Sequence, residues 1–254
     1  MNGRKSLRNT AWYHHWFGAD YLQLYQHRSA GEAERTIAWL VGAIGLSPPA
    51  KVLDLACGNG RHSVELEKWG FTTYGLDLSW PLLINADSPG NSSGIVRTRG
   101  DMRCLPFADG SFNLILSLFT SFGYFSLPEE DNKVLGEVSR CLSGGGFYVL
   151  DFLNATVVRE EIIPSEEAEI DGKKVDILRW VDDRNERIEK RILIHERDGA
   201  LREYRESVRL YSRDKLIDMM NAAGISVKSV YGDYTGSAFE DNSPRLIIIG
   251  RKNA

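Results

Sequence analysis

The first 155 residues alternate between short apolar runs and longer segments whose apolar positions recur at helical spacing. The apolar runs are 51–55, 72–77, 95–98, 112–118 and the FYVLDF run that follows Gly144-Gly145-Gly146. The helical segments are 29–44, 61–69, a short one that begins at Ser79, and 127–142. Short apolar runs between amphipathic helices are typical of buried parallel strands, so this part of the chain predicts an α/β fold with helices on both faces of a parallel sheet.

The pattern changes after Asn154. Between residues 166 and 211 apolar and polar positions alternate at a period of two, and Asp171-Gly172 and Asp198-Gly199 mark turns. This alternation predicts an antiparallel meander, either inserted in the sheet or covering its ligand-binding edge. Its charged residues at 182–206 are expected to form the side that faces solvent.

The C-terminal part returns to helix and strand. Ser212 is expected to cap a helix through Ala223, which Gly224 ends. Residues 225–231 and 246–250 are apolar strands that are expected to pair in antiparallel fashion at the edge of the sheet.

Composition and charge narrow the class of protein. The 254 residues are 43% hydrophobic and 26% charged, which suits one large globular domain. A net charge of −4 provides no basic surface for nucleic acid, and no apolar run approaches the roughly 20 residues of a membrane-spanning helix. The N-terminal stretch lacks the apolar core of a signal peptide. The three cysteines have no metal-ligand spacing, so free thiols in a cytoplasmic protein without a metal site are expected: Cys57, Cys104 and Cys141.

Three carboxylates stand at or just after the carboxyl ends of predicted strands: Asp54, Asp77 and Asp101. Because these ends share one edge of a parallel sheet, the three are expected to line one cleft. Gly58 and Gly60 form a turn that lets the backbone approach a ligand closely. Asp77 follows Gly58 by 19 residues, about the spacing at which an acidic residue meets ribose hydroxyls in dinucleotide folds.

Each of these features is common by itself, since glycine turns and strand-end aspartates often serve only as turns and helix caps. Their order on alternating strands favours an adenosine-containing ligand. Two classes of ligand fit. Gly58-x-Gly60-x-x-Ser63 approaches the G-x-G-x-x-G/A of nicotinamide enzymes, but the third glycine is a serine. An NAD(P)-dependent oxidoreductase and a non-catalytic nucleotide-binding module are therefore kept as alternative functions.

The motifs resemble those of class I S-adenosylmethionine-dependent methyltransferases. VLDLACGNGRH at 52–62 is similar to the first motif of that family, YGLDLS at 74–79 to its second, RGDMRCLPF at 99–107 to its third and FNLILSLFTSFGYF at 112–125 to its fourth. The N-terminal DYLQLYQHR, the SFGY loop and the predicted insertion also resemble sugar N-methyltransferases and related small-molecule enzymes. The Asn/Asp-Pro-Pro-Tyr of enzymes that methylate nucleobases or glutamine is absent after the fourth strand.

The resemblance implies a Rossmann-like, seven-stranded, mostly parallel sheet with an antiparallel β insertion after the fifth strand. It divides the chain into an N-terminal helical lid segment (1–46), a cofactor-binding core (47–155), the insertion (156–211) and a C-terminal helix and strand pair (212–254). It also implies S-adenosyl-L-methionine as cofactor and methyl transfer to nitrogen or oxygen of a small-molecule substrate. The protein is expected to act as a monomer or homodimer, without nucleic acid or membrane as partner.

Position by position, the resemblance assigns the adenosine part of the cofactor to four residues. Asp77 binds the ribose hydroxyls and Leu78 packs on the adenine. Asp101 and Met102 hold the adenine amine and ring.

The methionine part is assigned to the first and fourth motifs. Asp54, Ala56 and Gly58 face it, and Gly60 shapes the turn. Leu118, at the end of the fourth strand, lies near the amino-acid end.

The acceptor side is assigned to the aromatic N-terminal segment and the loop after the fourth strand. Tyr21, Tyr25 and Arg28 are expected to close over the cofactor, with Arg28 toward its carboxylate. Candidates for positioning the acceptor or acting as its base are Tyr13, His14, Tyr25 and Tyr124. Adjacent histidines such as His14-His15 are more often packing or surface residues. Arg245 is expected to face solvent from an edge strand or to reach the substrate pocket.

Overall fold

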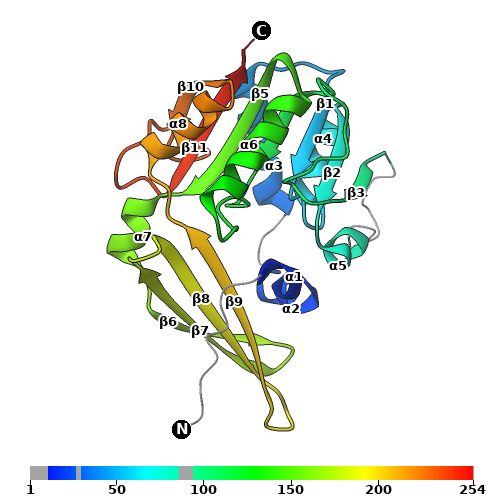
Figure 1. Ribbon diagram of the computed structural model, residues 1–254. Coiled ribbons are helices and arrows are strands. Elements are labelled where there is room, and N and C mark those ends of the chain that lie inside the picture. Colours follow the sequence, from blue (N-terminus) through cyan, green and yellow to red (C-terminus); the bar gives the residue numbers. More distant parts are fainter. Residues whose placement is uncertain (1–10, 27–29, 86–93, 254) are drawn as a thin grey trace.

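The computed structural model describes residues 11–26, 30–85 and 94–253, which fold into two β-sheets flanked by helices (Figure 1). The core sheet contains β1 (Lys51–Leu55), β2 (Thr72–Asp77), β3 (Val96–Arg99), β4 (Phe112–Ser117), β5 (Leu142–Leu153), β10 (Ile225–Tyr231) and β11 (Arg245–Lys252). Within the described residues it is seven-stranded, in the order β10-β11-β5-β4-β1-β2-β3. The predicted fold class is confirmed.

Side chains of the central strands are buried on both faces of the core sheet. On one face Leu53, Ile115 and Leu150 pack against α6 (Pro128–Cys141) and α8 (Arg213–Ala222). On the other face their neighbours Val52, Leu114 and Val149 pack against α3 (Ala30–Ile44) and α4 (Arg61–Lys68). Strands covered on both faces have no polar side to show, which explains why they read as continuous apolar runs in the sequence.

The direction of the strands separates the core sheet into two parts. The pairs β1–β2, β1–β4, β2–β3 and β4–β5 are parallel. Among the described strands β11 runs antiparallel to both of its neighbours, β5 and β10. The predicted terminal strand pair is therefore confirmed. Of these two strands, β10 is the edge strand and β11 lies between β10 and β5.

The second sheet is the predicted antiparallel meander. It consists of β6 (Ser165–Ile170), β7 (Lys173–Asp182), β8 (Arg187–His195) and β9 (Leu201–Arg209) in sequential order. A helix that the pattern did not predict, α7 (Ala155–Glu161), connects it to β5. The expectation that the charged residues of this segment face solvent is wrong for Arg187 and Lys190, which are buried.

The N-terminal helices lie between the two sheets. α1 (Tyr13–Trp16) contacts β9, and α2 (Ala19–Leu24) contacts β6 and α5 (Trp80–Ile84). Figure 1 shows both helices beside β9 and below the carboxyl ends of the core strands. Among the helices of the described ranges, none has both the length and the apolar character that crossing a membrane requires.

Candidate active site

The carboxyl ends of β1 to β4 meet at one edge of the core sheet. β1 and β4 are neighbours, and the chain leaves them in opposite directions, toward β2 on one side and toward β5 on the other. Such a reversal opens a crevice between the two strand ends. A cavity of about 400 Å³ lies at this point, a volume suited to a small-molecule ligand.

Most of the predicted site residues line this cavity. They are Tyr13, Tyr21, Tyr25, Asp54, Ala56, Gly58, Asp77, Leu78, Asp101, Met102, Leu118 and Tyr124. Gly60 lies outside the lining and precedes α4 with a φ of 78°, which is a turn-shaping position. His14 is exposed and also lies outside the lining. Arg28 lies outside the described residues.

The turn after β1 borders the cavity and has positive φ values at two of its residues. Ala56 and Gly58 have φ values of 60° and 58°, and a non-glycine residue in this region costs about 1–3 kcal/mol. The turn is fixed by hydrogen bonds from Cys57 N to Leu76 O (3.0 Å) and from Gly60 N to Cys57 O (2.9 Å). The strain at Ala56 is thus held by the neighbouring strand.

Asp54 is the most deeply buried acid of the cavity, at 2% exposure. Burial raises the pKa of its carboxyl to about 6, and a hydrogen bond from Ser63 Oγ (2.6 Å) opposes this rise only in part. Asp54 therefore changes charge just below neutral pH.

Asp77 connects two of the loops that form the cavity. Its Oδ2 accepts from Gly58 N (2.8 Å) and its Oδ1 accepts from Ser79 N (2.7 Å). Burial raises the pKa of this carboxyl, and the backbone hydrogen bonds oppose the rise. The side chain thereby holds the turn after β1 beside the loop after β2.

Asp101 is ion-paired with Arg103. The carboxylate accepts from Arg103 N (2.9 Å) and from its guanidinium Nη2 (2.6 Å). Burial alone would raise the pKa of Asp101, but these hydrogen bonds outweigh it and lower the pKa. Asp101 is therefore a permanent hydrogen-bond acceptor, as a partner for an exocyclic amine must be.

Aromatic side chains from the N-terminal segment and from the loop after β4 also line the cavity. The rings of Phe17 and Tyr124 stack at 5.9 Å between centroids, and those of Tyr21 and Tyr25 lie 4.9 Å apart. Burial raises the pKa of Tyr13, so its phenol is protonated near neutral pH and suits hydrogen bonding rather than proton abstraction.

The second sheet anchors this N-terminal segment. Trp16 Nε1 donates to Glu206 (2.5 Å) and Tyr204 OH donates to Asp20 (2.7 Å). Lys190 Nζ hydrogen-bonds to the hydroxyl of Tyr25. The segment therefore covers the cavity from a platform that the antiparallel strands provide.

The loop after β4 has strained backbone that the sequence did not reveal. Phe119 and Thr120 have φ values of 55° and 62°. Asp151, fully buried on β5, accepts from Phe119 N (2.7 Å) and from Arg245 Nε (2.8 Å). Arg245 Nη2 also donates to Thr120 Oγ1 (2.8 Å). Arg245 thus forms an ion pair with Asp151. It is not among the residues that line the cavity.

Sequence reasoning missed several lining residues, among them Asn59, Arg61, His62, Phe119 and Ser121. The strand-end rule that found the first three aspartates would also have found Asp151, which ends the FYVLD run. Nothing in the local pattern marks the other residues. In the described part of the chain, no three His, Cys, Asp or Glu side chains are placed to hold a metal ion.

The strand order, the antiparallel β11 and a cavity lined by Asp54, Asp77 and Asp101 define the fold of class I S-adenosylmethionine-dependent methyltransferases. Residues 52–146 match the family model described as a methyltransferase domain. The predicted resemblance is confirmed over this segment, which matches a methyltransferase domain.

Individual proteins that this chain resembles are also named as methyltransferases. Demethylmenaquinone methyltransferase of Mycolicibacterium paratuberculosis is 32% identical over 149 residues, which are 56% of this chain and 59% of that protein. A solved S-adenosylmethionine-dependent methyltransferase of Clostridium acetobutylicum has a TM-score of 0.77 at 19% identity, covering 92% of this chain and 97% of that one. The sugar N-methyltransferase KedS8 of Streptoalloteichus has a TM-score of 0.70 at 19% identity, covering 100% and 99%. The chain spans about half the length of the curated relatives it matches.

Proposed function

We propose that the protein is an S-adenosylmethionine-dependent methyltransferase that methylates a nitrogen or oxygen of a small polar molecule. The observation that carries this proposal is the convergence of Asp54, Asp77 and Asp101 on one cavity of about 400 Å³. The donor set suits the cofactor, because it combines carboxylates for its hydroxyl, amine and ammonium groups with apolar Leu78, Met102 and Leu118 for its rings and chain. When bound, S-adenosylmethionine supplies a methyl group already activated on a sulfonium.

The protein's own residues then bind the cofactor, orient the acceptor and exclude water. Asp77 and Leu78 hold the ribose and adenine, Asp101 and Met102 the adenine edge and ring. Asp54, Ala56, Gly58 and Leu118 face the amino-acid end, and Tyr21 and Tyr25 cover it. Most of the rate gain in such a site comes from holding the acceptor in line with the methyl group away from water.

The acceptor side is made by Tyr13 and Tyr124. The raised pKa of Tyr13 makes it a hydrogen-bond partner of the acceptor rather than its base. In this proposal residues 1–46 act as the lid, 47–155 and 212–254 as the core and 156–211 as the platform. The substrate is small, because the lid and the loop after β4 both border the cavity. We further propose a cytoplasmic location, which suits the free cysteines.

Calorimetric titration with S-adenosylmethionine and S-adenosylhomocysteine tests the proposal, followed by transfer of a labelled methyl group to a panel of amino sugars, simple amines and sugar hydroxyls. Micromolar binding and labelling of a panel compound are expected. Binding of a reduced nicotinamide cofactor in place of both adenosyl compounds would establish the oxidoreductase alternative. Tight binding of S-adenosylhomocysteine without transfer to any class of acceptor would favour a non-catalytic module.

The pH dependence of binding tests the role of Asp54. Its pKa of about 6 in the free protein should fall when a cationic amino group binds beside it, so binding releases a proton. The affinity for S-adenosylhomocysteine should therefore decrease as the pH falls through 6, by up to about tenfold per pH unit. Asp54→Asn should abolish this slope, as measured by calorimetry between pH 5 and 8.

Asp131 provides a matched control for this measurement, since burial also raises its pKa to about 6 but it lies outside the cavity lining. Asp131→Asn should keep the slope of the wild-type protein. A slope that survives in Asp54→Asn would assign the titration to another group and remove Asp54 from the cofactor site.

A further inference from the structure

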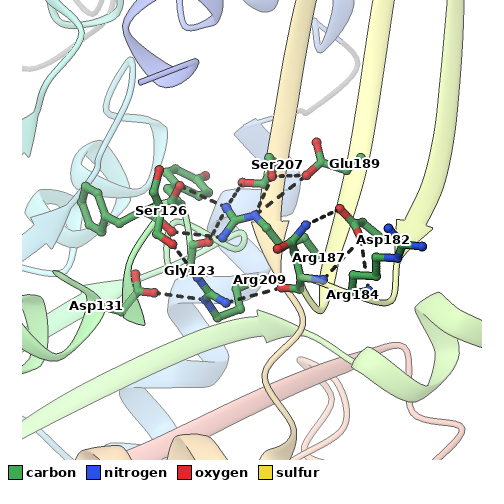
Figure 2. Close-up of polar contacts among 12 residues, drawn as sticks. Gly123, Ser126, Asp131, Asp182, Arg184, Arg187, Glu189, Ser207 and Arg209 are labelled. Carbon is green, nitrogen blue, oxygen red and sulfur yellow. Dashed lines mark hydrogen bonds and ion pairs between the residues drawn. The ribbon is translucent and has the colours of Figure 1, made fainter. Parts of the chain in front are cut away.

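The loop after β4 is held from the second sheet. Arg187, the first residue of β8, is only 4% exposed. Its guanidinium donates to the carbonyl oxygens of three consecutive loop residues, the first of which, Gly123, is labelled in Figure 2. Nη2 donates to Gly123 O (3.2 Å) and Tyr124 O (3.1 Å), and Nη1 donates to Phe125 O (3.0 Å). Tyr124 and Phe125 line the cavity.

Arg187 also binds β9. Its Nε donates to Ser207 Oγ (2.6 Å) and its Nη2 to Ser207 O (2.7 Å). Arg209, further along β9, donates from its backbone N to Gly123 O (2.9 Å) and from its side chain to Ser126 O (2.9 Å). The loop is thus fastened to the antiparallel sheet at each residue from 123 to 126.

This arrangement needs an arginine. Three successive carbonyls that converge on one point need several donors in a fixed plane, which a guanidinium supplies and a lysine ammonium does not. The loop approaches β9 closely, because Gly123 has a φ of 80° and a Cβ there would lie 3.4 Å from the backbone of Arg209. Desolvating a guanidinium is unfavourable, and the carboxylate of Glu189, 3.9 Å from Nε, partly offsets that cost.

Near residues 123–126, one buried side chain has no hydrogen-bond partner among the described residues. Ser121 is one of the residues that line the cavity, it is 6% exposed, and its buried Oγ has no hydrogen-bond partner in the part of the chain that the structure describes. Phe122, between Ser121 and the residues that Arg187 and Arg209 hold, is buried in the core. Its ring lies 6.0 Å from that of Tyr211, measured between centroids. A buried hydroxyl that lacks a protein partner, on a residue that borders a cavity, is a position that a polar group of a ligand can satisfy.

We propose that Arg187 is a positioning residue for the methyl acceptor: it fixes the backbone of residues 123–125 and thereby directs Ser121 Oγ and the Tyr124 ring toward the acceptor's polar group. This inference rests on the proposed function. It makes the antiparallel sheet part of the acceptor site. The hydrogen bonds described above for Asp54, Asp77 and Asp101 come from the core segments.

The test compares Arg187→Lys with Arg191→Lys. Both keep the charge, and Arg191 lies on the same strand but pairs with Glu203 at the surface (2.7 Å, 38% exposed). In Arg187→Lys, hydrogen exchange in residues 119–126 should become at least about tenfold faster, while exchange in residues 52–62 and the affinity for S-adenosylhomocysteine stay within about threefold of wild type. The KM for the panel compound that wild type methylates should rise about tenfold or more, since small misplacements of bound groups are costly. Arg191→Lys should behave as wild type.

A second variant covers the case in which Arg187→Lys does not fold. Ser121→Ala removes a hydroxyl that has no protein partner, so its melting temperature should not fall, while the KM for the acceptor rises and the affinity for S-adenosylhomocysteine is kept. Equal loss toward donor and acceptor, or unchanged exchange in 119–126, would make Arg187 a purely structural residue. An unchanged acceptor KM in Ser121→Ala would also overturn the proposal. A wild-type protein that binds no S-adenosylhomocysteine would instead refute the proposed function.

Discussion

Asp77→Ala should lower the affinity for S-adenosylhomocysteine by about 100-fold or more. Two hydrogen bonds from ribose hydroxyls to a buried carboxylate contribute about 1.5–3 kcal/mol each, and about 2.7 kcal/mol corresponds to a factor of 100. The substitution also removes the acceptor for Gly58 N and Ser79 N, so the turn after β1 loses its side-chain link to the loop after β2. Calorimetry on the purified variant measures the loss directly.

The two contributions can be separated with ligands that differ only in the ribose. Wild type should prefer adenosine to 2′,3′-dideoxyadenosine, and Asp77→Ala should lose that preference. If Asp77 only supports the loop, the variant will weaken both ligands equally and the ribose assignment is wrong. Asp109→Ala is the matched control, because its side chain is 80% exposed and lies outside the cavity lining.

The strands and helices of the core could be predicted because each face of the sheet imposes its own requirement on the sequence. Val52 and Leu53 face opposite layers of helices, and this shows as a continuous apolar run. The position of β11 between β5 and β10 could not be predicted in this way. Its apolar run Leu246–Ile249 indicates burial on both faces, but not which strands are its neighbours.

The strand-end aspartates could be predicted because topology alone brings them together. Arg187 could not. At period two it reads as one more charged position of a solvated meander, and only the packing of the loop after β4 against β8 and β9 buries it. The strain at Phe119 and Thr120 was equally hidden, since both are ordinary residues whose φ values are imposed by a partner on β5, Asp151.

Asp151→Ala should have the largest effect on stability, a loss of about 3–5 kcal/mol in the free energy of unfolding. This is the range for removing one partner of a buried ion pair, since the charge that remains is uncompensated. The Arg245 side chain that remains is 28% exposed, so the loss should lie toward the lower end of this range. Asp151 is fully buried, and its carboxylate accepts from both Phe119 N and Arg245 Nε. Urea denaturation followed by circular dichroism measures the loss. Asp176→Ala is the control: its pair with His195 is partly exposed and should be worth about 0–1 kcal/mol.

A double-mutant cycle with Arg245→Ala distinguishes the ion pair from simple cavity formation. If the pair holds the loop, the double variant should lose at least about 1 kcal/mol less than the sum of the single losses, because no charge is left unpaired. Additive losses would mean that the two side chains act independently. The strained residues Phe119 and Thr120 should relax in the double variant. Since Phe119 and Ser121 line the cavity, the folded double variant should then keep its affinity for S-adenosylhomocysteine but lose methyl transfer, which places the strain on the acceptor side.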